Sequence, residues 1–483
     1  MRAPVTQDRP DQSDTKPNLR KQCRFLQSKR FYCWSDQYDR PGKEMRRNMR
    51  IKKALATLLV AASAVTALTG CGGGGEQKDD KKPESISFWY YDKDTAAQTM
   101  AWREAAADFT KKTGVKVKFE VKSFAQIAQN SSQFLNSDQA PDIMESNRGN
   151  GSAGMLSSMG LLTDLGPYVE KYGWDKKVTE ADASMAKYDE KGVMGGDTWY
   201  GAPNYAEYQR VYYNKDMFAK YNIKEPTTLA EFEDACQKFK DAGVTPIAAD
   251  AGEFGVLWLW WQLVSTKADK GFIQDWQMYK HEVNWKDESL TYATKTLNDW
   301  LDKGYISRNA TGLKAEDTTT SFIKGEYPIY QTGTWNQGRF VDQIKGFEWD
   351  ASILPGSKFA QGCTGNLLTI PEKSKNKDLA AQLIDMVLSK KEQNGIAKHG
   401  GIPLAADNDS IDNPKNKAMA EEYAKFSKEN ALSYYPDYPA SNLTDAIPAA
   451  LQELVNGTKT PDQTLEAIKD AYTSGVKDMD VKD

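Results

Sequence analysis

The sequence predicts an α/β protein with two lobes, and two observations support this class. The first is an alternation of segments, in which the apolar and aromatic run Ile86–Tyr91 precedes a helical pattern over 95–113 and a β-rich run over 115–121. The second is the length of 483 residues with 40 % hydrophobic content, which is enough for two globular lobes rather than one.

Further elements follow along the chain. A short strand is predicted at 141–144, and a helix at 229–242 has Thr227 and Thr228 placed to cap its first turn. Another helix is predicted at 379–388, and residues 418–472 have a mainly helical pattern. No segment of 20–50 residues repeats, so a solenoid or propeller is not indicated.

Charge and cysteine content exclude several classes of protein. The net charge of −4 conceals a basic segment, 1–70, and an acidic remainder, which argues against nucleic-acid binding because phosphates require a basic surface. Beyond that segment and Cys71, only Cys236 and Cys363 remain, and we expect both to be free thiols. No zinc spacing or cofactor-binding motif is present, so we expect no metal and no cofactor.

The N-terminal region has the pattern of a secretion signal. A charged segment from Met45 precedes the apolar run 54–68, which is short for a bilayer span of roughly 20 residues. The box Leu68-Thr-Gly-Cys71 resembles the bacterial lipobox, which directs lipidation of Cys71. We therefore predict a leader outside the native protein at 1–44, a lipoprotein signal peptide at 45–70, and a flexible, Gly-rich tether at 71–83.

Four segments of the remaining chain carry a resemblance in their order and spacing. They are Trp199–Pro203 running into Tyr212–Asp216, Phe322–Tyr327 ending at Gly333–Trp335, Ile353–Gly356, and Ser374–Ala380 with Gly400–Pro403. Together they resemble the family 1 extracellular solute-binding proteins, the maltose-binding-protein-like substrate-binding lipoproteins of carbohydrate ABC importers.

The resemblance implies a periplasmic-binding-protein-like fold with several hinge crossings and a ligand cleft between the lobes. We expect lobe 1 to comprise 84–206 with 353–405, and lobe 2 to comprise 207–352 with 406–483. It further implies a monomer, lipid-anchored at Cys71 on the extracellular face of the bacterial membrane, that captures an oligosaccharide and docks to the transmembrane subunits of an ABC permease.

A sugar site needs polar groups around the ring edge and aromatic rings against the C–H faces. By the resemblance, Asp92 and Lys93 after the first strand and Glu207 at a lobe crossing are candidate ligand contacts, although Asp92 and Lys93 are also consistent with a salt bridge in a turn. Trp335 is the candidate stacking residue, and Glu253 matches a ligand-binding Glu less closely.

Two loops supply further candidates. The segment 146–150 should form a loop at the carboxyl end of a strand, where α/β sheets bind ligands, and it offers Asn147 and Arg148. Maltose-binding protein has a Trp and an Asp-Arg pair there, so we expect a ligand other than maltodextrin, and a solvated loop is the alternative. Gly365 and Asn366 in the predicted loop 362–366, and Tyr438 in 434–438, complete the expected site.

Catalysis is not expected. A glycosidase needs one carboxylic acid with a raised pKa, and Lys93 beside Asp92 would favour the charged form. One alternative is a binder of a non-sugar solute, such as a phosphodiester, a polyamine or a metal ion. Another is a surface glycan adhesin without transport.

Overall fold

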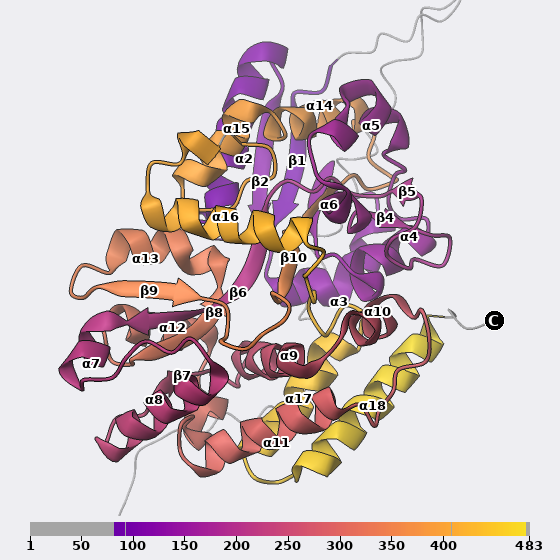
Figure 1. Ribbon diagram of the computed structural model, residues 1–483. Coiled ribbons are helices and arrows are strands. Elements are labelled where there is room, and N and C mark those ends of the chain that lie inside the picture. The colour runs from indigo at the N-terminus through magenta and orange to yellow at the C-terminus, as the bar shows by residue number, and fades with distance from the viewer. Residues whose placement is uncertain (1–81, 92, 407, 480–483) are drawn as a thin grey trace, which may run out of the picture. The chain divides into compact units, whose positions relative to one another are not determined.

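The computed structural model describes residues 82–91, 93–406 and 408–479. They belong to one compact unit, Asp80–Asp483, in which helices surround two main β-sheets (Figure 1). The predicted α/β class is therefore confirmed. In this part of the chain, no helix combines the length and the apolar character needed to cross a bilayer.

The first sheet has the strand order β11-β3-β1-β2. Its strands are β1 (Ser85–Tyr90), β2 (Lys116–Val121), β3 (Ile143–Ser146) and β11 (Leu367–Thr369). Strands β1, β2 and β3 are parallel, and β11 joins β3 in the antiparallel direction. Because β1 and β3 run in the same direction, their carboxyl ends lie at the same edge of the sheet. Tyr91 and Asn147 follow these two ends.

The second sheet has the order β10-β6-β8-β7, with β9 also paired to β6. Its strands are β6 (Ala206–Asn214), β7 (Ile247–Ala248), β8 (Ile329–Gly333), β9 (Trp349–Ser352) and β10 (Gly362–Thr364). All nine residues of β6 are buried, because β8, β9 and β10 pair with it in the antiparallel direction. A small separate hairpin contains β4 (Lys187–Tyr188) and β5 (Thr198–Trp199).

Helices cover both sheets. Those that contribute to the hydrophobic core around the first sheet include α2 (Ala97–Thr113), α3 (Phe124–Leu135), α4 (Met155–Ser158), α5 (Gly166–Tyr172), α6 (Glu180–Ser184), α14 (Lys377–Val387) and α15 (Lys390–Lys398). Those around the second include α7 (Lys215–Lys220), α8 (Leu229–Asp241), α9 (Gly255–Lys267), α10 (Lys270–Met278), α11 (Glu288–Asp302), α12 (Ala315–Ile323), α13 (Gln337–Gln343), α17 (Leu443–Val455) and α18 (Pro461–Asp478). Helix α16 (Pro414–Lys428) lies on a smaller cluster that includes Tyr208 of β6.

The chain passes between the two sheets at several points. It leaves the first sheet before β6 and returns to it between β10 and β11. It then passes to the second sheet again through α16, which leads to α17 and α18, and these two helices pack with α9 and α11. Glu207 lies at the first of these passages, Asn366 at the second and Tyr438 at the third. Three candidate residues that are distant in sequence therefore belong to three crossing segments.

Several predicted elements are confirmed. Helix α8 begins at Leu229, and the Thr228 side chain accepts a hydrogen bond from the Glu231 backbone N–H, as its position predicted. In the run 256–261 of α9, five residues are buried, whereas Trp258 is only partly buried. Cys236 and Cys363 are both buried free thiols.

Two predicted loops need correction. Residues 362–364 form β10, because the absence of a side chain at Gly362 lets its backbone pass close to Glu207 and Tyr208. In the segment 146–150, Ser146 ends β3 and Asn150 begins a short π-helical turn, Asn150–Gly154. Only the three residues between them form the expected loop.

Candidate binding site between the two sheets

Arg148 links the crossing segments through a buried polar network. Its Nη2 donates to a carboxylate oxygen of Glu207, and its Nη1 donates to the side-chain oxygen of Asn366. Arg148 and Glu207 are only 3 % and 9 % exposed. A buried ion pair is stable only when its remaining polar atoms also find partners, and Arg148 meets this condition by donating from Nε to Cys363 Sγ at 3.4 Å.

Two tyrosines complete the surroundings of Arg148. The guanidinium carbon lies 5.3 Å from the ring centroid of Tyr435 and 5.4 Å from that of Tyr438, which is cation–π distance. Both rings come from the loop between α16 and α17. Arg148 therefore holds together the start of β6, the β10–β11 connection and the tyrosine-containing loop.

The network continues to the edge of the first sheet. The Asn366 side chain donates to Glu145 Oε1 at 2.8 Å, and the other oxygen of Glu145 accepts the backbone N–H of Tyr91 at 3.0 Å. Gly365 lies beside Asn366, and a Cβ there would clash with the Tyr205 ring. The position of Gly365 therefore requires glycine for packing. Asp92, the next candidate after Tyr91, lies outside the described residues.

A narrow cleft that is partly open to solvent lies beside this network. Its walls include Phe124, Asn147, Arg148, Asp437, Tyr438 and Thr444. Asn147, Arg148 and Tyr438 were expected at the site, whereas Phe124 and Asp437 were missed. The loop 434–438 was identified from its aromatic residues, but its carboxylate carries no local signal that distinguishes it from a surface residue.

A row of aromatic rings extends from the edge of the first sheet to the second sheet. Adjacent ring centroids in this row are 5.0–6.0 Å apart, and the rings are those of Tyr91, Phe124, Phe254, Trp258 and Trp335. All five side chains are partly exposed. The Trp335 indole lies back over Gly333, where a Cβ would clash with the ring. The row is therefore a partly exposed aromatic surface that also packs against the cores around both sheets.

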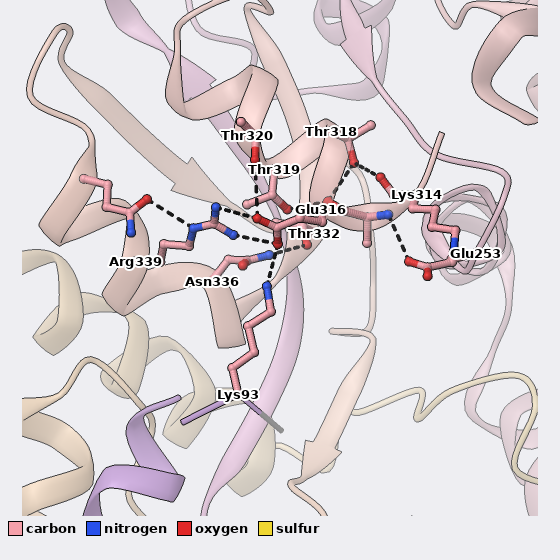
Figure 2. A network of polar contacts seen from close by, with 12 residues as sticks. Lys93, Glu253, Lys314, Glu316, Thr318, Thr319, Thr320, Thr332, Asn336 and Arg339 are labelled. Atoms are coloured by element: carbon pink, nitrogen blue, oxygen red, sulfur yellow. Dashed lines mark hydrogen bonds and ion pairs between the residues drawn. The ribbon is translucent and has the colours of Figure 1, made fainter. Parts of the chain in front are cut away.

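Figure 2 shows a second polar network, centred on Glu316 at the start of α12. Arg339 donates to both carboxylate oxygens of Glu316 at 2.8 and 2.9 Å, and Lys93 Nζ lies 2.5 Å from one of them. The hydrogen bonds from Arg339, aided by Lys93, lower the pKa of Glu316 to about 2. Glu253 accepts the backbone N–H of Ala315 at 3.0 Å, so it acts as a cap of α12.

The candidate residues thus fall into two groups. Asn147, Arg148, Glu207, Gly365, Asn366 and Tyr438 lie together around the buried network. Lys93 and Glu253 both contact the first turn of α12, and Trp335 contacts the aromatic row. Sequence reasoning missed Glu316, which pairs with Lys93 from 223 residues away, and Arg339, which binds the same carboxylate. Within the described ranges, no group of three His, Cys, Asp or Glu could hold a metal ion.

Comparison with known proteins identifies similar chains. A sequence model of the family described as bacterial extracellular solute-binding protein matches residues 93–394. The diacetylchitobiose binding protein DasA of Streptomyces coelicolor is 25 % identical over 371 residues, which cover 73 % of this chain and 82 % of that protein.

Solved structures share the fold. A chitin oligosaccharide binding protein matches with a TM-score of 0.70 and 19 % identity, over 81 % of this chain and 99 % of that chain. A protein studied for xylan utilization by Caldanaerobius polysaccharolyticus matches with a TM-score of 0.69 and 21 % identity, over 80 % and 99 % of the two chains.

Proposed function

The chain belongs to the bacterial extracellular solute-binding proteins, and from this membership we propose that it captures an oligosaccharide outside the cell for import by an ABC transporter. One observation carries the sugar specificity. The partly exposed row from Tyr91 to Trp335 lies beside a cleft lined by polar groups. Sugars have apolar C–H faces and hydroxyls at their edges, so this combination suits them.

Similar proteins support the same ligand class. The relative DasA is named for binding diacetylchitobiose, and one structural neighbour is named for binding chitin oligosaccharides. A row of five rings is longer than one pyranose, which favours an oligosaccharide over a monosaccharide. The candidate contacts are Lys93, Asn147, Glu253, Trp335 and Tyr438.

Arg148 and Glu207 have a different role in this proposal. Their charged groups already bind each other, and the Asn366 oxygen is also engaged by Arg148. We expect this trio to hold the crossing segments in place while other groups contact the sugar. The protein then acts as a receptor rather than an enzyme, because Glu207 beside a buried guanidinium is unsuited to act as a general acid.

Closure of two lobes around the ligand is part of the proposal. With the lobe boundaries predicted from the sequence, Lys93 and Phe124 belong to lobe 1, whereas Glu316 and Phe254 belong to lobe 2. The Lys93–Glu316 ion pair and the Phe124–Phe254 ring contact would then form only in the closed state. Small-angle scattering should show a smaller radius of gyration with ligand, and an unchanged radius at saturation would contradict closure.

The proposed location follows from the N-terminal sequence, which lies outside the described residues. A diacylated Cys71 would hold the monomeric receptor on the outer face of the membrane, close to the permease. Mass spectrometry of membrane-extracted protein would detect the lipidated N-terminal peptide. Membrane retention of a Cys71→Ser variant would contradict this anchor.

A ligand screen tests the sugar specificity. The whole purified chain is melted with diacetylchitobiose, xylotriose, raffinose, spermidine or glycerophosphocholine. A ligand at 100 times its Kd should stabilise the fold by about 2.7 kcal/mol. We expect one of the three glycans to raise the melting temperature. A shift with spermidine or the phosphodiester and none with glycans would contradict the proposal.

A further inference from the structure

Asp437 is an acidic residue that lines the cleft. It lies in the loop between α16 and α17, and its neighbours in the cleft wall include Phe124, Asn147 and Thr444. The Thr444 hydroxyl donates to its carboxylate at 3.5 Å, the outer limit of a hydrogen bond. The carboxylate also accepts its own backbone N–H, so its bonds to the protein are one local contact and one long contact.

Other carboxylates near the cleft differ from Asp437 in this respect. Glu145 accepts from Asn366 and from the Tyr91 N–H, and Glu207 accepts from Arg148. Glu316 accepts both N–H groups of Arg339, and Glu253 accepts the Ala315 N–H. Glu145, Glu207 and Glu316 thus have specific strong partners within the protein, which a ligand would have to displace or share.

A carboxylate that is partly removed from water and has few strong donors is unfavourable in the free protein. Burial raises the pKa of the Asp437 carboxyl, as expected for an anion removed from water without sufficient compensation. Arg148 is close enough to act on Asp437 electrostatically, but its N–H groups point to Glu207, Asn366, Cys363 and Asn147. A ligand with hydroxyl groups would donate further hydrogen bonds to this carboxylate.

We propose that Asp437 is a ligand-binding residue that accepts hydrogen bonds from sugar hydroxyls and disfavours anionic solutes, while Phe124 covers an apolar face of the same sugar ring. This inference deepens the proposed function and rests on it. The hydroxyl and amide groups of Ser152, Asn147 and Thr444 in the cleft wall add neutral hydrogen-bonding groups around the ring edge. A neutral sugar fits this set, whereas a phosphate group would meet repulsion from the carboxylate.

The test compares Asp437→Asn with Asp445→Asn in the whole chain. Asp445 is an exposed acid in the first turn of α17, so its variant removes the same charge nearby without touching the cleft. Calorimetry with diacetylchitobiose, xylotriose and raffinose gives the affinities, and melting without ligand reports folding. For the glycan that binds, D437N should raise Kd about 10- to 100-fold, because hydrogen bonds to a charged group are strong. D445N should leave Kd within about twofold.

The ligand-free melting temperature separates binding from folding. D437N should melt at or above the temperature of the unsubstituted protein, because it removes a charge that is partly removed from water and only weakly bonded to the protein. Equal glycan affinity in D437N and the unsubstituted protein would overturn the role of Asp437 and leave the proposed function intact. If none of the three glycans binds the unsubstituted protein, the proposed function fails and the inference falls with it.

Discussion

Lys93 Nζ lies 2.5 Å from a carboxylate oxygen of Glu316, although 223 residues separate the two positions in the chain. Glu316 does not depend on Lys93 for its charge, because Arg339 binds both of its oxygens. Arg339 therefore holds the acceptor ionised and oriented independently of Lys93. Both partners stay more than half exposed, so water and salt screen the pair.

We expect this ion pair to favour the ligand-bound state by a few tenths to about 1 kcal/mol. Lys93→Met and Glu316→Gln should each weaken glycan binding by up to about fivefold, and the double variant should be no weaker than either single one. The control is Lys324→Met, at an exposed lysine that terminates α12. Fully additive effects in calorimetry would show that the two residues act independently.

The buried pair of Arg148 and Glu207 should behave differently. Arg148→Met leaves Glu207 as a buried charge without its partner, and we expect unfolding in urea to become easier by about 3–5 kcal/mol. Arg148→Met combined with Glu207→Gln should recover part of this loss. If Arg148→Met retains full stability but loses glycan binding, Arg148 contacts the ligand instead.

Trp335 should contribute to binding more than to stability. Trp335→Ala removes a partly exposed ring, and hot-spot truncations of this kind cost about 2–4 kcal/mol, or roughly 30- to 700-fold in affinity. The matched control is Trp260→Ala on α9, which is fully buried and should cost about 3–5 kcal/mol of stability. Calorimetry measures the loss of glycan affinity, and melting without ligand measures the loss of stability, so together they distinguish the two variants. A large fall in melting temperature for Trp335→Ala with normal binding would place this ring in the core.

Asp250 makes stability depend on pH. The carboxylate is buried, and it accepts the Gly255 N–H at 3.0 Å and the Thr318 hydroxyl at 3.2 Å. Burial raises its pKa from 3.8 to about 6, so the folded protein binds a proton more tightly than the unfolded chain. The stabilisation by protonation is fully present below about pH 4 and is lost as the pH rises through about 6.

The matched variant for this prediction is Asp250→Asn, which has the same shape and does not titrate. From pH 4 to pH 7, the unfolding free energy of the unsubstituted protein should fall by roughly 2.4 kcal/mol relative to this variant. Urea unfolding at several pH values measures the difference. A constant difference across this range would show that Asp250 does not titrate there.

Local sequence patterns were sufficient for the main elements. The run after Ser85, the helix ending at Thr113 and the strand ending at Val121 follow from periodicity and from adjacent turn signals. The cap at Thr228 was identified because capping needs only the next three residues. The fold class, the order of the helices and strands, and the free thiols of Cys236 and Cys363 could thus be predicted from the sequence alone.

Long-range pairing decided the roles of the site residues. The sequence identified Arg148, Glu207 and Asn366 as polar groups near a cleft, but the structure shows that they bind one another across 59 and 218 residues. The partner of Lys93 and the exposure of Asp437 to the cleft were likewise invisible in the sequence. A charged side chain binds whichever opposite charge the fold brings within a few ångströms, and only the tertiary structure determines that neighbour.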